Sequence, residues 1–298
     1  MDISRRSLIR AAAVAAVGSA ATVIVPEEAL ADTAPPDESV GMLYDSTKCV
    51  GCKACMGACN EANNITPDTA TSDGRAAMPI DLNEHALNII KVYNDPASAN
   101  HAYIKRQCMH CVDPACVSAC MIGAMKKQAN GVVTYDASRC VGCRYCEMGC
   151  PFNVPKFEWS KAVPKIVKCQ LCIHRTSKGQ LPACVEVCPP KAVIYGKRSD
   201  LLAEAHRRLQ EHPERYIPKV YGEHEAGGTQ VLYLAGVEFE KLGMPDYGDR
   251  PVPETVHNVQ HTVYQGFALP MALYGVLAGI TWRNRRQKQE TPAEEKQP

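Results

Sequence analysis

Cysteines are the residues of this chain whose spacing points most directly to chemistry. The stretch from Cys140 to Pro151 has the form C-x2-C-x2-C-x3-C-P, with its cysteines at Cys140, Cys143, Cys146 and Cys150. This spacing is typical of [4Fe–4S] ligation, because three cysteines two residues apart wrap one cube and the fourth ligates the other cluster of a pair. Gly142 lets the backbone approach a large inorganic group closely. The stretch therefore predicts an iron–sulfur site.

The remaining cysteines repeat this pattern, so all 16 fall into four groups of four with none left over. The run just described is the third quartet, and the fourth carries a long insertion between its second and third members. The other quartets are Cys49, Cys52, Cys55 and Cys59; Cys108, Cys111, Cys116 and Cys120; and Cys169, Cys172, Cys184 and Cys188. Four complete quartets predict four [4Fe–4S] clusters with every cysteine as an iron ligand. The sequence contains no recognisable pair of a nucleophile and a base that would indicate a catalytic residue.

Disulfide bonds and zinc sites are two other uses of cysteine, but either one would make the regular spacing of the quartets a coincidence. An exported chain with an even number of cysteines can form a disulfide framework, but cysteines two residues apart rarely suit a bridge. Zinc ribbons also use C-x2-C pairs, yet they take two separate pairs for each metal rather than a tight run of four. Iron–sulfur clusters are therefore the favoured interpretation.

Histidines are the other candidate ligands. His110 and His174 lie beside quartets that are already complete, so we expect them to be spacers or surface residues. His257 and His261 are four residues apart and would share one face of a helix. They could contact a quinone or a haem of a partner, or they could be interfacial polar residues.

The N-terminus resembles a twin-arginine export signal. Arg5 and Arg6 stand in the sequence Ser-Arg-Arg-Ser-Leu-Ile-Arg, an apolar run follows over residues 11–25, and Ala-Leu-Ala at residues 29–31 fits a cleavage site. Residues 1–31 are therefore predicted to be a signal peptide. The alternative, a membrane anchor, is less favoured because the run is short and rich in alanine. The twin-arginine route carries folded proteins, which suits clusters inserted before export.

The C-terminal part contains 20 residues without charge, 263–282. As a helix this stretch would be about 30 Å long, enough to cross a bilayer core. Basic residues follow it at once, so the positive-inside rule predicts a cytoplasmic tail and a periplasmic cluster domain. We expect a single transmembrane anchor over residues 258–284 and a tail over 285–298, with a buried helix of a soluble domain as the alternative.

Between the two ends the sequence predicts an α+β fold of tandem bacterial-ferredoxin-like modules, in which a strand, a ligand loop and a short helix repeat. We expect a four-cluster ferredoxin domain over residues 32–200 and a C-terminal extension over 201–257. Residues 200–212 have the pattern of an amphipathic helix. Strand character marks residues 42–44, 88–93, 102–105, 131–135, 192–196 and 231–234.

The charge balance argues against a nucleic-acid-binding surface. The formal net charge is +1, and each oxidised cluster with four thiolates adds about −2, giving roughly −7 for the loaded protein. Basic residues near the cysteines, such as Lys53, Arg144 and Lys168, then compensate local charge. The apolar core of each module is small, so we expect that the protein without clusters does not hold this fold.

Together these features resemble the four-cluster ferredoxin (beta) subunits of respiratory oxidoreductases, such as formate dehydrogenase and dimethyl sulfoxide reductase. Residues 41–47 (GMLYDST), 107–114 (QCMHCVDP) and 259–264 (VQHTVY) are similar to the membrane-anchored ferredoxin subunit of the periplasmic hydrogenase-2 type. Met121 stands where the third and fourth quartets have proline, which departs from the ferredoxin pattern but removes no ligand.

The resemblance implies that quartets exchange their last cysteines, the first with the fourth and the second with the third. The four ligand sets would be Cys49, Cys52, Cys55 and Cys188; Cys169, Cys172, Cys184 and Cys59; Cys108, Cys111, Cys116 and Cys150; and Cys140, Cys143, Cys146 and Cys120.

The resemblance also implies an electron-transfer subunit at the periplasmic face of the inner membrane. It would pass electrons between the small and large subunits of a nickel–iron hydrogenase and the quinone pool, through an integral membrane partner. An alternative is the beta subunit of a molybdenum enzyme such as formate dehydrogenase. An exported structural protein stapled by disulfides is a third reading.

Overall fold

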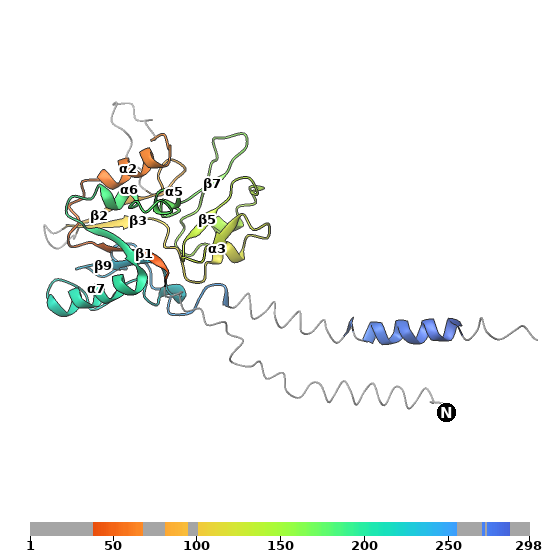
Figure 1. Cartoon of the computed structure of the whole chain (residues 1–298). Coiled ribbons are helices and arrows are strands. Elements are labelled where there is room, and N and C mark those ends of the chain that lie inside the picture. Colours follow the sequence, from red (N-terminus) through yellow and green to blue (C-terminus); the bar gives the residue numbers. More distant parts are fainter. Residues whose placement is uncertain (1–37, 68–80, 95–100, 255–269, 272, 287–298) are drawn as a thin grey trace, which may run out of the picture. The chain divides into compact units, whose positions relative to one another are not determined.

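Strand β1 (Val40–Asp45) is the centre of the largest sheet in the structure (Figure 1). The structure is a computed structural model that describes residues 38–67, 81–94, 101–254, 270–271 and 273–286. Strand β1 pairs antiparallel with β8 (Val193–Lys197) and parallel with β9 (Val231–Leu234). Since β1 leads into the first quartet and β8 follows the fourth, this pairing brings the first and last ligand loops together.

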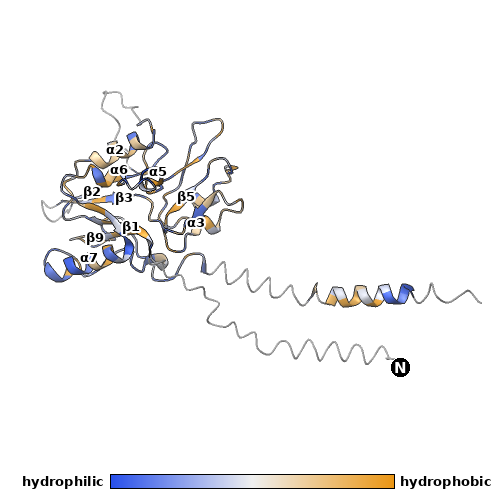
Figure 2. Ribbon diagram, viewed as in Figure 1, coloured by the Kyte–Doolittle hydropathy of each residue, from blue (hydrophilic) through white to orange (hydrophobic). Residues whose placement is uncertain are grey.

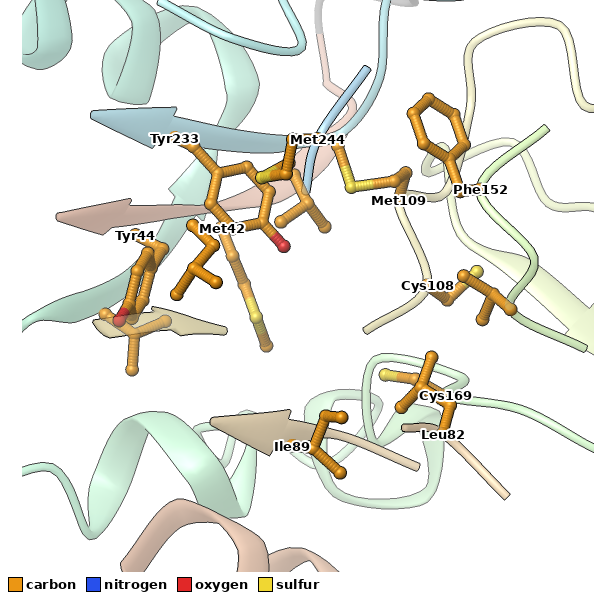
Figure 3. Close-up of a cluster of buried hydrophobic side chains, with 14 of the residues drawn as sticks. Met42, Tyr44, Leu82, Ile89, Cys108, Met109, Phe152, Cys169, Tyr233 and Met244 are labelled. Carbon is orange, nitrogen blue, oxygen red and sulfur yellow. The ribbon is translucent and has the colours of Figure 1, made fainter. Parts of the chain in front are cut away.

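Alternation along the strands divides the sheet between two layers. Leu43 and Leu232 face helix α7 (Arg198–Glu211) and pack with its Leu201. Met42 and Tyr233 face the other way, into the core that surrounds the ligand loops (Figure 3). Figure 2 shows that α7 is largely hydrophilic, as expected for a helix with one face on a sheet and the other in water.

The remaining strands form three antiparallel pairs. Strand β2 (Ile89–Asn94) pairs with β3 (His101–Arg106). The other two pairs are shorter: β4 (Met125–Lys127) with β5 (Val133–Tyr135), and β6 (Lys156–Phe157) with β7 (Ile166–Val167). Every strand expected from the sequence is present, with boundaries that differ by one or two residues, and α7 confirms the expected amphipathic helix.

Short helices follow the ligand loops. Helix α2 (Ala54–Ala62) packs against α6 (Ala183–Glu186), and α3 (Ala115–Ser118) packs against α4 (Tyr145–Met148). Helix α5 (Ile173–Thr176) and the 3-10 helix η2 (Glu225–Gly227) complete the described helices before residue 254. Consequently the first quartet meets the fourth and the second meets the third.

The expected C-terminal transmembrane helix is wrong. Among the described residues, no helix has both the length and the apolar character needed to cross a bilayer. The described helical residues near the C-terminus are 270–271 and 273–286. Their last turn carries Arg283, Arg285 and Arg286 and is visibly hydrophilic (Figure 2). The apolar run in the sequence thus does not correspond to a spanning helix in this part of the structure.

Several expectations concern residues outside those described. They are the signal peptide over 1–31, His257 and His261, all of the segment 258–269, and the end of the tail from residue 287. The domain boundaries proposed from the sequence stay predictions.

Candidate metal centres

All four ligand loops use the same backbone turn. The residue directly before the second cysteine of each quartet has a positive φ, namely Gly51 (67°), His110 (49°), Gly142 (75°) and Leu171 (52°). Such a value suits glycine but strains His110 and Leu171, and strain of this kind is concentrated at functional sites. The turn also aims backbone N–H groups at cysteine sulfurs, as in the Leu171 N–H to Cys169 Sγ distance of 3.4 Å. The loops are therefore built to surround anionic groups.

None of the sixteen cysteines forms a disulfide, so the disulfide framework is excluded. Within the described part of the chain, no three His, Cys, Asp or Glu side chains are close enough to hold a single metal ion. A zinc ribbon would require such a group.

The first set of thiols, set A, lines one small cavity. Its members are contributed by the first quartet and by the end of the fourth: Cys49, Cys52, Cys55 and Cys188. Lys105 and Tyr44 line the same cavity. Burial raises the pKa of Cys55 to about 11; Lys105 opposes this rise, and the thiols of Cys184, Cys49 and Cys188 contribute to it.

The second set, set B, surrounds the thiol of Cys59. Burial, opposed by Lys105, raises the pKa of Cys59 to about 12 together with its neighbours Cys184 and Cys172. Burial also raises the pKa of Cys169, and the thiols of Cys59, Cys108 and Cys184 add to the rise, so Cys169 lies near this group and near Cys108. Set B thus consists of Cys59, Cys169, Cys172 and Cys184.

Two more sets come from the second and third quartets. Burial raises the pKa of Cys111 well above its usual value, and the thiols of Cys150, Cys108 and Cys116 add to the rise. These four cysteines form set C. Burial also raises the pKa of Cys146 to about 11, with contributions from the thiols of Cys120, Cys140 and Cys143. These four cysteines form set D. Each of the four sets therefore combines three cysteines of one quartet with the last cysteine of another.

The chemistry of the donors fits iron–sulfur clusters. Buried thiols with raised pKa values are protonated in the metal-free protein, so binding iron as thiolates must release protons. An orphaned donor gives a second test. The Val133 N–H donates to Nδ1 of His110 (2.9 Å), so Nε2 carries the ring proton, and this buried atom has no partner among the described protein atoms. A sulfur-rich group beside Cys108 and Cys111 would supply an acceptor.

The four sets follow one another in a row. Sets A and B are adjacent, because the thiol of Cys184 in set B contributes to the raised pKa of Cys55 in set A. Sets B and C are adjacent, because the thiol of Cys108 in set C contributes to the raised pKa of Cys169 in set B. Cys116 of set C neighbours Cys146 of set D. Figure 3 shows Cys108 and Cys169 beside each other at the edge of the main core. Only Cys52 of set A and Cys143 of set D are exposed among the sixteen cysteines.

Sequence reasoning missed two residues at these sites. Lys105 is 1% exposed although it lies between Ile104 and Arg106 in a short strand, and no local pattern marks it as buried. His110 was expected to be a spacer or a surface residue, but it is also 1% exposed. Its position inside a quartet, directly before a ligand cysteine, was the available signal.

Comparison with known proteins identifies the family of the chain. Residues 99–198 match the family of the 4Fe-4S dicluster domain. The "Hydrogenase-2 operon protein HybA" of Escherichia coli O157:H7 is 41% identical, with 95% of each chain covered. The "Formate dehydrogenase, nitrate-inducible, iron-sulfur subunit" of Escherichia coli strain K12 is 35% identical, covering 71% of this chain and 75% of that protein.

Fold, thiol sets and relatives define an iron–sulfur protein that carries electrons and holds [4Fe–4S] clusters. The chain belongs to the family of the hydrogenase-2 operon protein HybA, among the ferredoxin-like subunits of respiratory oxidoreductases. This confirms the family expected from the sequence motifs.

Proposed function

We propose that this chain is the electron-transfer subunit of a periplasmic hydrogenase complex. It would pass electrons between the small and large subunits of a nickel–iron hydrogenase and an integral membrane subunit that reacts with quinone. The observation that carries this proposal is the row of sets A, B, C and D with one exposed cysteine at each end. When bound, each [4Fe–4S] cluster takes up and releases one electron. The protein holds the clusters in order and excludes water from the inner two sets.

The proposed ligand sets are those that share an electrostatic environment. Set A would hold the first cluster, set B the second, set C the third and set D the fourth. The packing of α2 on α6 and of α3 on α4 supports the exchange of the last cysteines. Replacing Cys143 by Ser, an exposed ligand of set D, should lower the iron content by about four atoms of sixteen. A loss of iron spread over all four clusters would contradict the assignment.

We further propose that residues 1–31 are a twin-arginine signal, followed by the ferredoxin domain (32–200) and the extension (201–257). The cluster-bearing protein would reside at the periplasmic face of the inner membrane, bound to its membrane partner. Replacing Arg5 and Arg6 by Lys should leave a folded, cluster-loaded protein in the cytoplasm. Export of this variant at the normal level would contradict the proposed route.

The catalytic partner is tested by the electron donor. Purified complexes should contain hydrogenase subunits, and molecular hydrogen should reduce the clusters, as seen by electron paramagnetic resonance (EPR). The relatives among formate dehydrogenase subunits favour one second candidate, a molybdenum enzyme as the partner. Cluster reduction by formate but not by hydrogen would replace the hydrogenase by that alternative.

A further inference from the structure

Lys105 is a buried lysine inside the cluster region. It lies on β3, where it pairs with Ile90 of β2, and its side chain is 1% exposed. Both residues line the cavity of set A, together with its four cysteines. Lys105 therefore presents its ammonium group from the hairpin toward the place where the first cluster would bind.

The position of this ammonium is held by neutral groups. Lys105 Nζ donates to Oε1 of Gln107, and Gln107 Nε2 donates to Sδ of Met42 at 3.3 Å. No carboxylate pairs with Lys105 among the residues that the structure describes. A buried charge without a counter-charge is strongly unfavourable, so a negative group must compensate it.

When iron is bound as thiolate, the negative groups around Lys105 would be cysteine sulfurs of two sets. Burial alone would lower the pKa of Lys105, but Cys184, Cys55 and Cys169 outweigh burial and raise it. Cys55 belongs to set A, whereas Cys169 and Cys184 belong to set B. Lys105 thus stands between the first two thiol sets rather than beside one of them.

Lys168 provides a contrast in the neighbouring region. Its Nζ donates to the carbonyl oxygens of Val133 (2.6 Å) and Cys169 (2.9 Å) and lies 3.9 Å from Cys108 Sγ of set C. In the described part of the chain, set D has no buried lysine near it, and its nearby Arg144 stacks on the exposed Trp159. Positive charge is therefore distributed unevenly along the row.

We propose that Lys105 is the shared counter-charge of the first two clusters and raises the reduction potentials of both. This inference rests on the ligand sets proposed above. A fixed positive charge stabilises the reduced, more negative cluster, and net charge near a cluster is one determinant of its potential. Lys105 is a positioning residue in this role, because it acts on the clusters from β3 without ligating iron.

The test is an EPR-monitored redox titration of the full-length protein in its complex, with Lys105→Met beside the wild type. Two of the four midpoint potentials should fall by ~59 mV each, which is a tenfold change in the equilibrium constant of a one-electron reduction. The other two potentials should stay unchanged. Lys105→Arg should restore both potentials. Lys91→Met is the matched control, because Lys91 lies on the adjacent strand β2, pairs with Asp81 and is partly exposed.

Iron analysis distinguishes a failure of the proposed role of Lys105 from a failure of the proposed function. Full iron content with four unshifted potentials in Lys105→Met would overturn the role of Lys105 and leave the ligand sets standing. Wild-type protein without about sixteen iron atoms would overturn the proposed function itself. Lys105→Met and Lys105→Gln could both lose iron. Loss of two clusters, with the other two retained, would support the shared counter-charge. Equal loss of all four clusters would overturn it.

Discussion

The two halves of the cluster region differ in how much protein supports the thiols. The A–B half, residues 38–106 and 169–254, contains the three-stranded sheet, α7 and the ligands of sets A and B. The C–D half, residues 107–168, contains two sheets with two strands each and the ligands of sets C and D. One apolar cluster of the C–D half consists of Cys116, Met125, Val133, Cys146 and Ile166, so two of its five residues are candidate ligands. The A–B half has an apolar cluster under α7 that contains no cysteine, whereas we expect the C–D half to depend on its metal.

Removal of iron should give the largest difference between the halves. Strand β1 is hydrogen bonded on both sides and buried, so it should keep part of its protection against amide hydrogen exchange. Strands of two or three residues cannot hold the C–D half without clusters. After anaerobic chelation, hydrogen-exchange mass spectrometry should show protection lost throughout residues 107–168 and retained in part in β1 and β9. Equal loss in both halves would contradict this view.

The next largest effect concerns the buried acid of the A–B half. Asp45 is fully buried and accepts hydrogen bonds from Arg208 Nη1 (3.0 Å) and the Tyr216 hydroxyl (2.8 Å). Asp45→Ala removes the buried partner of Arg208, which keeps only its contact with Glu204, and should cost about 3–5 kcal/mol of unfolding free energy, measured by denaturant titration.

The control for Asp45 is an exposed ion pair on the same helix. Glu211→Ala removes the contact with Arg207, both of whose side chains are about half exposed. This change should cost less than ~1 kcal/mol. A similar cost for both variants would show that burial does not decide the value of the Asp45 pair.

Glycine substitutions compare the packing of the two halves directly. A Cβ atom at Gly41 on β1 would overlap the carbonyl oxygen of Gln230, which accepts the Met42 N–H. Gly41→Ala should therefore cost about 1–3 kcal/mol and disturb the β1–β9 pairing. At Gly123 in the C–D half a Cβ meets no atom within 4 Å, so Gly123→Ala should cost only the ~1 kcal/mol of its positive φ of 64°. Thermal unfolding measures both, and the reverse order would contradict the packing difference.

The smallest expected effect is a pH dependence on α7. Burial raises the pKa of Glu204, but hydrogen bonds from Arg208 and Arg207 outweigh it and lower the pKa. A carboxyl with a lowered folded-state pKa adds stability above its unfolded pKa of about 4.3, and that stability is lost as the pH falls through the folded pKa. The difference in unfolding free energy between wild type and Glu204→Gln should therefore shrink from pH 7 toward pH 4. A difference that grows with acidity would be inconsistent with this sign.

Local sequence patterns predicted much of the fold and its chemistry. The strand after the fourth quartet, β8, and the amphipathic helix α7 have boundaries close to those expected, because alternation and helical periodicity depend on neighbouring residues. The C-terminal apolar run was misleading for the same reason. Its composition suits a bilayer core, but no described helix is long and apolar enough to cross one, and the described helical residues 273–286 end in arginines.

The sequence by itself determined that sixteen cysteines form four quartets and that each quartet starts with a loop able to wrap a cluster. That follows from spacing, since cysteines two residues apart are close whatever the rest of the chain does. Tertiary structure brings the ends of different quartets together, through the packing of α2 on α6 and α3 on α4, and this supports the exchanged ligand sets that the family resemblance implies. It also decided that Lys105 is buried between sets A and B. Both features depend on residues far apart in the chain, which the pairing of β1 with β8 and β9 and the packing of the short helices bring together.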